Sequence, residues 1–499
     1  MCPTPPSVTT GPQPAAHQFE FDGGAKAPLE RTEIKISYPL PDTPQTTTHS
    51  ILHIGDTCTL VRYVTEGELY PEPIDRLVFR AAAARASIFV TQADDHALLI
   101  DLNHERYRIK PASAKQIIEI HTLHGNDTVY IADTLKNPFH IETGPGNDTV
   151  VTSNGHATVL TGPGDDMVMT REGTSYIDTG EGNDIVNANG SGKTVAYTGK
   201  GADFFRGGAG TAFVDAGEDD DVIVGGQSHS ILCGGDGNDL ISAGAGSNVI
   251  YAGRGQDTLN EIKGKDKVFT ESQPTYISEG SIVPSSKVAN TPGGLGTNTF
   301  KVSSEPLSES GLVIKGSEAF TERVKDDLKL LLGSASGSQL LRELTKSIRI
   351  SKKPITIVEL KHVENGAYVP SQGADRSFIR DGQAGRPDFG GTLYYNPTYS
   401  QSNFVPLVAL YHELCHAYNF VTGTQFPGTS PDKRGGTKKA PQVANAELQA
   451  VGLPCNIEPF DFDNDPATPP GTTNPLPYSE NGLREELGLP LRTTYIFYD

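Results

Sequence analysis

An aspartate-containing motif recurs at nearly constant spacing through the middle of the chain, and this periodicity restricts the fold more than any other feature. Segments such as TGPGNDTVV, TGPGDDMVM, TGEGNDIVN and GGDGNDLIS align with one another. Successive aspartates are 21, 18, 18, 19, 18, 18 and 18 residues apart, and they are Asp127, Asp148, Asp166, Asp184, Asp203, Asp221, Asp239 and Asp257. A fixed period of this kind predicts a solenoid, in which each repeat stacks on its neighbours.

Apolar residues recur with half of this period. One set follows each aspartate by two positions and consists of Val129, Val150, Val168, Val186, Phe205, Ile223, Ile241 and Leu259. A second set lies midway between these residues and consists of Val159, Ile177, Val195, Val214, Leu232 and Ile250. Each half-repeat therefore predicts one short strand with one inward side chain, and two half-repeats predict one coil of a right-handed parallel β-roll over residues 121–270. The glycines of the motif supply the positive φ angles that the tight turns need.

The repeats resemble the calcium-binding RTX nonapeptide, G-G-x-G-x-D-x-U-x. In that family both edges of the roll usually bind calcium. Here the turns at the midpoints lack the acid, because the corresponding residues are Ala157, Ser175, Lys193, Ala212, Ser230 and Asn248. We therefore expect Ca²⁺ along one edge only, where the eight aspartates and the turn carbonyls offer hard oxygen ligands. The alternative is a metal-free roll with Asp and Asn in its turns.

The charge balance excludes some classes of partner. The formal net charge is −20, and residues 121–270 alone contain 21 acidic and 9 basic residues. Nucleic-acid binders carry a basic footprint, so no nucleic-acid partner is expected. No apolar run reaches the ~18 residues of a membrane span, so no membrane span is expected. The first residues lack the basic and apolar regions of a cleaved signal peptide, which leaves a cytosolic protein or export without a cleaved signal.

Composition and periodicity divide the chain into five parts. We expect a disordered N-terminus over 1–30, a β-rich region over 31–120 that caps the solenoid, the RTX-like roll over 121–270, a flexible linker over 271–310, and a globular domain over 311–499. In this last domain FTERVKDDLKLLL and SQLLRELTKSI have helical spacing, whereas KPITIVEL and GTLYYNP are typical of strands. The predicted fold is thus a β-solenoid followed by an α+β domain.

The globular domain contains the motif His412-Glu413-Leu414-Cys415-His416 within an apolar, helical run. On a helix His412 and His416 lie one turn apart on one face, so both imidazoles can bind one Zn²⁺, with Glu413 as the general base. This arrangement predicts a zincin-like, HExxH metallopeptidase. The alternative is a partly buried helix with two histidines and a solvated glutamate.

Elimination narrows the set of residues that could be the third zinc ligand. No histidine follows His416, and only His362 precedes it in this domain. Asn419 and Thr422 stand where metzincins have Gly and His, which excludes that family. We expect Glu447, on a helix-like segment, to be the ligand, as in gluzincins. The lesser candidates are Glu458, Asp461, Glu480 and Cys455, whereas Cys415 is expected to pack in the core.

The C-terminal segment offers donors for an oxyanion. Arg492 and Tyr495 have the R-x-x-Y spacing that resembles the transition-state pair of clostridial neurotoxin proteases. A developing oxyanion needs a donor besides zinc, and these two residues are the candidates. The alternative is a surface arginine and a packed tyrosine.

Residues from about 311 to 495 resemble the NleD-like metallopeptidase effectors that bacterial type III secretion systems inject. The features that carry the resemblance are SASGSQLLREL, GTLYYNP, HELCH, ELQAVGLP and ENGLREELGLPLR. The resemblance implies a single-zinc endopeptidase in which Glu447 matches the downstream glutamate of the family. It also implies host protein substrates, which are protein kinases in the best-known case.

We therefore expect a secreted bacterial zinc endopeptidase, an effector or toxin in virulence, that binds calcium through its roll and is translocated into a host cell. One alternative is an extracellular RTX protease exported by a type I system, although serralysin-like enzymes place the protease before the roll. Another is a calcium-dependent adhesin or surface-binding protein with a vestigial protease domain. The intact Glu413 argues against this second alternative.

Overall fold

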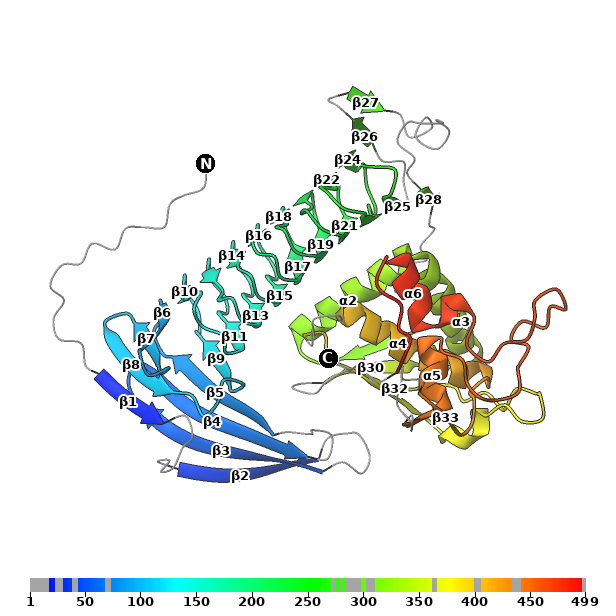
Figure 1. Ribbon diagram of the computed structural model, residues 1–499, viewed down its shortest axis with the longest axis horizontal. Coiled ribbons are helices and arrows are strands. Elements are labelled where there is room, and N and C mark those ends of the chain that lie inside the picture. Colours follow the sequence, from blue (N-terminus) through cyan, green and yellow to red (C-terminus); the bar gives the residue numbers. More distant parts are fainter. Residues whose placement is uncertain are drawn as a thin grey trace. The chain divides into compact units, whose positions relative to one another are not determined.

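The computed structural model describes residues 18–22, 30–37, 44–67, 73–270, 275–278, 281–283, 298–301, 310–360, 366–398, 405–432 and 441–495. The chain forms two compact units, Met1–Gly173 and Thr174–Asp499. The repeat region continues through both units as a β-solenoid of about eight turns over residues 118–269 (Figure 1). The solenoid and the smaller α+β region that follows it confirm the predicted fold class.

The first unit combines antiparallel strands with the first coils. Strands β2 to β5 form an antiparallel meander, and β6, β7 and β8 pair antiparallel. From β9 onward the pairing is parallel. The strands are β1 (Gln18–Asp22), β2 (Glu30–Ser37), β3 (Pro44–Ile54), β4 (Cys58–Gly67), β5 (Ile74–Ala81), β6 (Ser87–Gln92), β7 (Leu98–Leu102), β8 (Glu105–Lys110), β9 (Ile117–His121), β10 (Thr128–Ile131), β11 (Phe139–Glu142), β12 (Thr149–Val151), β13 (Ala157–Leu160) and β14 (Met167–Thr170).

Part of the segment that was expected to be disordered is ordered. Gln18–Asp22 form β1, which pairs parallel with β8. Residues 1–17 and 23–29, for which disorder was also expected, lie outside the described residues.

The second unit continues the coils and adds the α+β region. The solenoid strands are β15 (Ser175–Asp178), β16 (Ile185–Ala188), β17 (Thr194–Lys200), β18 (Phe204–Arg206), β19 (Ala212–Glu218), β20 (Val222–Val224), β21 (Ser230–Asp236), β22 (Leu240–Ser242), β23 (Val249–Tyr251), β24 (Thr258–Asn260), β25 (Lys267–Thr270), β26 (Thr275–Ser278), β27 (Ser281–Val283) and β28 (Asn298–Lys301). Strands β26, β27 and β28 lie in the segment that was expected to be a flexible linker. Strands β26 and β28 extend the two solenoid sheets, because β26 pairs with β24 and β28 pairs with β25, and β27 pairs antiparallel with β26.

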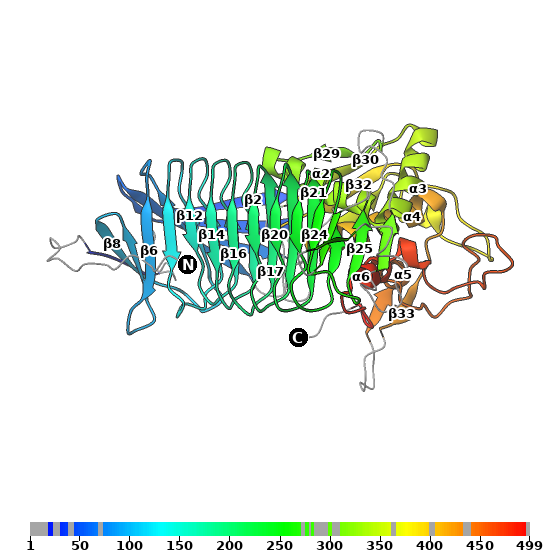
Figure 2. The ribbon, with the colours of Figure 1, turned by 90° about the horizontal axis from the view of Figure 1, so that it is seen from above.

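Strands β16, β20 and β24 run alongside one another in Figure 2. Inward apolar side chains form two ladders inside the coils. All eight apolar residues that follow the aspartates are at most 1 % exposed. In the second sheet, Ile177 pairs with Ala196, which pairs with Val214. The predicted inward residue Val195 is therefore wrong by one position, and the turn position assigned to Lys193 belongs to Thr194. The cause is the 19-residue spacing between Asp184 and Asp203, which shifts this half-coil by one residue.

The α+β region has a four-stranded sheet in the order β29-β30-β32-β31, with β31 antiparallel at its edge. The predicted helices are α2 and α3, and the predicted strands are β30 and β32. The elements are β29 (Val313–Lys315), α2 (Glu318–Gly333), α3 (Ala335–Ser351), β30 (Ile355–Glu359), β31 (Ala367–Pro370), η2 (Ala374–Ser377), β32 (Gly391–Tyr395), α4 (Pro406–Thr422), β33 (Thr429–Pro431), β34 (Gln442–Ala444), α5 (Asn445–Val451), η3 (Leu476–Tyr478) and α6 (Glu480–Glu486).

Candidate active site

Helix α4 carries the two histidines and is buried along almost its whole length. It begins with Pro406, whose fixed φ suits the first helical position, and ends at Gly423 in the left-handed conformation. Val405 is the N-cap and makes no side-chain cap.

Contacts from the C-terminal segment hold α4 in place. The Tyr411 hydroxyl donates to the Pro477 carbonyl at 2.7 Å. The ring of Tyr418 stacks on Tyr478 with centroids 4.1 Å apart. A buried helix with these lateral contacts presents its histidines in a fixed orientation.

Three side chains from α4 and α5 converge on one point. The Nε2 atoms of His412 and His416 are 3.1 Å apart, and each lies 3.3 Å from Oε2 of Glu447. Ligands at the ~2.0–2.1 Å zinc distance in a tetrahedron are about 3.3 Å apart. The spacing of these three atoms therefore fits one zinc ion. Burial opposes a positive charge on His412, but the Glu447 and Glu480 carboxylates raise its pKa to about 10.

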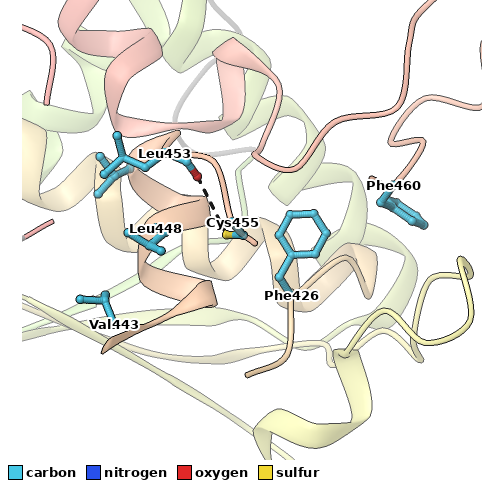
Figure 3. Close-up of a cluster of buried hydrophobic side chains, with 7 residues drawn as sticks. Phe426, Val443, Leu448, Leu453, Cys455 and Phe460 are labelled. Atoms are coloured by element: carbon cyan, nitrogen blue, oxygen red, sulfur yellow. Dashed lines mark hydrogen bonds between the residues drawn. The ribbon is translucent and has the colours of Figure 1, made fainter. Parts of the chain in front are cut away.

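Helix α5 places Glu447 opposite α4. Its other face packs in a hydrophobic cluster with Phe426, Val443, Leu453, Cys455 and Phe460 (Figure 3). Gln449 also bonds to the segment after α4, donating to the Thr424 carbonyl at 2.7 Å. Burial in this cluster raises the pKa of the Cys455 thiol to about 12. Cys455 is thus a core residue rather than a ligand.

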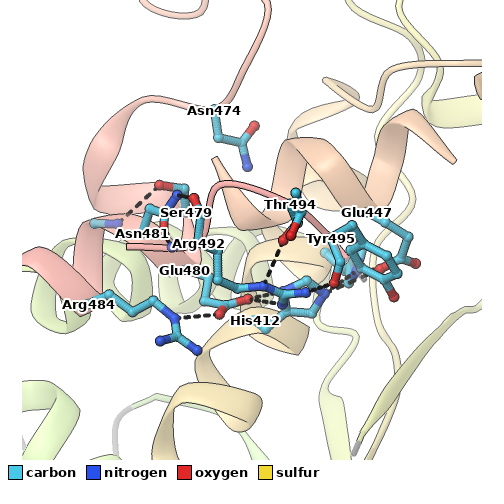
Figure 4. Close-up of polar contacts among 12 residues, drawn as sticks. His412, Glu447, Asn474, Ser479, Glu480, Asn481, Arg484, Arg492, Thr494 and Tyr495 are labelled. Atoms are coloured by element: carbon cyan, nitrogen blue, oxygen red, sulfur yellow. Dashed lines mark hydrogen bonds and ion pairs between the residues drawn. The ribbon is translucent and has the colours of Figure 1, made fainter. Parts of the chain in front are cut away.

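Glu480 holds His412 from the side opposite the metal position (Figure 4). Nδ1 of His412 donates to Oε2 of Glu480 at 3.0 Å, which directs Nε2 toward His416 and Glu447, where a metal ion can replace its proton. Arg484 and Arg492 also donate to this buried carboxylate, at 2.6 and 2.9 Å. Burial alone would raise the pKa of Glu480, but the hydrogen bond from His412 and the two guanidinium groups lower it to about 2. Glu480 therefore positions His412 and is not a third ligand.

Glu413 lies beside the ligands in a crowded, buried position. Burial raises its pKa, which makes the carboxylate a stronger base. Gly366 approaches it so closely that a Cβ there would lie 2.7 Å from Cγ of Glu413. Gly366 directly precedes the edge strand β31 in the sequence, and only glycine fits at this position.

Arg492 and Tyr495 reach the same site. Asn481 on α6 holds the backbone of Arg492 through two hydrogen bonds, at 2.8 and 3.0 Å. The Arg492 guanidinium bonds to Glu480 and to the carbonyl of Tyr495, so it is engaged with its own chain. Burial and the adjacent Glu447 carboxylate, to which the phenol hydrogen-bonds, raise the pKa of Tyr495. Tyr495 therefore stays protonated and can donate a hydrogen bond.

These side chains line one cavity of about 330 Å³. Its lining residues include Gly366, Tyr368, His412, Glu413, His416, Glu447, Glu480, Arg492, Tyr495 and Gln425. Sequence reasoning missed Gly366, Tyr368 and Gln425, which come from segments without a motif. Glu458 and Asp461 are not among the residues that line the cavity, and His362 lies outside the described residues. Cys415 is fully buried in the core, as expected.

The repeat aspartates form a separate series along the roll. Oδ1 of six of them accepts the backbone N–H of the aspartate one coil before, for example from Asp221 to Asp239 at 2.9 Å and from Asp203 to Asp221 at 2.8 Å. For Asp127, Asp221, Asp239 and Asp257, the other oxygen, Oδ2, is buried and has no hydrogen-bond partner among the described residues. Buried carboxylate oxygens without partners fit the hard ligands of a calcium ion.

The opposite edge differs from this arrangement. The amide of Ser230 donates to Asn248, and the amide of Asn248 donates to Oδ1 of Asp266. Oδ2 of Asp266 accepts from the Lys263 amide. Asp266 is thus an acidic residue on this edge that sequence reasoning missed. Both of its carboxylate oxygens accept hydrogen bonds from the protein itself.

Comparison with known families gave two matches. Residues 308–495 match the Peptidase_M91 family model, described as an effector protein. Four segments, 160–192, 189–223, 197–232 and 233–260, match the RTX calcium-binding nonapeptide repeat. These matches suggest a peptidase with a protein substrate and are consistent with a secreted, calcium-binding protein. No curated protein and no solved structure matches the chain. In the described part of the chain, no helix is long and apolar enough to cross a membrane.

Proposed function

We propose that residues 310–495 are a zinc-dependent endopeptidase with His412, His416 and Glu447 as ligands. The observation that carries this proposal is the convergence of three ligand atoms within 3.1–3.3 Å of one another, beside a buried glutamate in the same cavity. When bound, zinc supplies Lewis-acid chemistry, which polarises a carbonyl and lowers the pKa of a water molecule.

The remaining chemistry belongs to the side chains. Glu413 takes a proton from the attacking water and passes it to the leaving amine, because its raised pKa lets it act in both directions. Tyr495 donates its hydroxyl hydrogen to the developing oxyanion. Arg492 acts mainly through Glu480, whose charge it neutralises and whose position it holds.

The substrate lies along the edge strand β31 beside Gly366. This strand leaves one edge of the four-stranded sheet unpaired among the described residues, and an extended peptide can add to such an edge. Together with the effector family match, this supports a protein substrate in a host cell, and protein kinases are the first class to assay. The repeat aspartates hold calcium along one edge of the roll, and the protein is secreted to act in virulence.

Glu413→Gln tests the proposal, because it keeps the shape of the side chain and removes the base. We expect the variant to bind zinc and to cleave peptides about 10²–10⁴-fold more slowly than the wild type. Terminal-peptide proteomics of a host lysate would compare the two proteins and would identify the substrate. Equal cleavage by both proteins would exclude Glu413 as the base.

A further inference from the structure

The outer face of one solenoid sheet is apolar in the second unit. Tyr176, Val195, Phe213, Ile231 and Val249 form a ladder on this face, and each is at most 2 % exposed. In the first unit the outward positions of β9 and β11 are instead Glu119, His121, His140 and Glu142. An outward sheet face in water is normally polar. The apolar ladder therefore indicates that another part of the protein packs on this face.

Helix α2 contacts the outer face of the same sheet through charged side chains. The Arg323 guanidinium lies 3.4 Å from the ring centroid of Tyr197 and 3.3 Å from Asp215, both on the outer face of the roll. Lys329, two turns farther along α2, pairs with Glu218 at 2.7 Å. The roll and the peptidase region thus share an interface within one compact unit, and this interface encloses a cavity of about 170 Å³.

Helix α6 connects this interface to the zinc ligands. At its C-terminal end, Tyr251 of β23 donates to Oε1 of Glu486 at 2.8 Å, and Nζ of Lys267 donates to the Glu485 carbonyl at 2.9 Å. His229 contacts the Leu487 carbonyl at 3.0 Å. At the other end of the same two-turn helix, Glu480 holds Nδ1 of His412.

Glu486 also links α6 to helix α3. Its two carboxylate oxygens accept the amides of Ala335 and Ser336 at 2.9 and 2.7 Å, which ties α6 to the first turn of α3. Loss of the Tyr251 contact therefore disturbs two helices that pack on α4. The residues that reach α6 lie in the coils of Asp221, Asp239 and Asp257, whose buried Oδ2 atoms fit calcium.

We propose that the roll is a calcium-dependent clamp for the zinc centre. Calcium orders the coils that carry His229, Tyr251 and Lys267, these coils hold α6, and α6 holds Glu480 against His412. This inference rests on the proposed zinc and calcium sites. Outer residues that orient a metal-ligating histidine typically change metal affinity by about 10–100-fold. By linkage, zinc must tighten calcium binding by the same factor that calcium tightens zinc binding.

The test measures the zinc affinity of the full chain with a chromophoric zinc chelator in competition. Calcium is removed beforehand on a chelating resin, which is separated from the protein before zinc is added, whereas a soluble chelator would remain in solution and compete for zinc. We expect zinc to bind about 10–100-fold more tightly in millimolar calcium than in calcium-free buffer. Far-UV circular dichroism on the same samples reports whether calcium orders the roll.

Tyr251→Phe and Lys267→Ala test the route of the coupling. Each removes a contact to α6 and leaves every proposed ligand in place, so the roll should still respond to calcium while the effect of calcium on zinc affinity shrinks. The matched controls are Tyr130→Phe, whose hydroxyl contacts Arg171 in the first unit, and Lys265→Ala, which is exposed. Both controls should keep the wild-type coupling. If Lys267→Ala fails to fold, Tyr251→Phe alone decides, because it removes a single oxygen atom.

The outcomes separate the two proposals. Absence of zinc binding by the wild type in both buffers would reject the proposed peptidase. Zinc binding with equal affinity in both buffers, or an unchanged roll spectrum, would overturn the clamp and leave the peptidase standing. Full coupling in Tyr251→Phe and Lys267→Ala would also overturn the clamp, because the effect would then not pass through α6.

Discussion

Replacing Glu480 by glutamine should weaken zinc binding without touching a ligand. The Glu480 carboxylate is fully buried and receives His412 at 3.0 Å, Arg484 at 2.6 Å and Arg492 at 2.9 Å. Removing one partner from a buried charge cluster typically costs about 3–5 kcal/mol, because the remaining charges lose their compensation. Here two guanidinium groups would be left without a carboxylate.

The expected loss of zinc affinity is about tenfold, at the lower end of the ~10–100-fold range for such outer residues. The amide oxygen of glutamine can still accept the hydrogen bond from His412, so the ring keeps part of its orientation. Competition with a chromophoric chelator measures the affinity. Urea unfolding followed by circular dichroism measures the stability, since the chain contains no tryptophan for fluorescence.

The matched control is Glu485→Gln on the same helix, where the side chain is exposed. It removes an equal charge and should leave both zinc affinity and unfolding midpoint unchanged. If Glu480→Gln binds zinc as tightly as the wild type, the orientation of His412 does not depend on the carboxylate, and the reasoning fails.

Three further predictions concern the oxyanion, the roll and the pH dependence of stability. Tyr495→Phe should lower kcat by about 10²–10³-fold with little change in KM, as expected for loss of one oxyanion donor, and an unchanged kcat would remove Tyr495 from the mechanism. Asp239→Ala should reduce the calcium-induced rise in melting temperature of the full chain, whereas Ser230→Ala on the opposite edge should not, and equal responses of the two variants would contradict a single calcium-binding edge. Burial raises the pKa of Asp327 to about 7 and that of Asp215 to about 6 beside the single Arg323 guanidinium. Between about pH 4 and these values the folded protein binds more protons than the unfolded chain, so stability should fall as pH rises through this window. In saturating calcium the melting temperature should drop from about pH 5 to about pH 8 and Asp327→Asn should flatten the slope, whereas a rise over that window would refute the assignment.

The sequence predicted the solenoid because its period is a direct property of the residue order. Each inward ladder needs an apolar residue at a fixed spacing, and Val129 or Ile223 reports this without knowledge of tertiary contacts. The error at Val195 arose where one inserted residue shifted the register. The outer ladder of Tyr176 and Phe213 escaped notice, because outward apolar residues acquire meaning only when a covering element such as α2 is known.

The part of the site that lies on a single helix was predictable, because the residue types and the spacing of His412 and His416 can be read directly from the sequence. Glu447 followed from elimination and from the family resemblance, and the structure places it at the same point. The role of Glu480 was not predictable, since sequence alone cannot tell a ligand from a carboxylate on the far side of the imidazole ring. Gly366 lacked any signal, because its function is the space that it leaves for Glu413.

The hydrogen bonds of the aspartate series also make the resistance of the roll to unfolding depend on the side from which force is applied. Oδ1 of an aspartate accepts the amide N–H of the aspartate one coil before it, as Asp239 accepts from Asp221. A force applied from the C-terminal side of the roll removes an acceptor first and frees one coil at a time, in the order in which repeat proteins lose neighbours. A force applied from the N-terminal side instead extracts donors and leaves each carboxylate buried behind them. Single-molecule pulling with one attachment fixed in a central coil and the other on either flank of the roll should therefore give different unfolding forces, with the smaller force for the C-terminal flank.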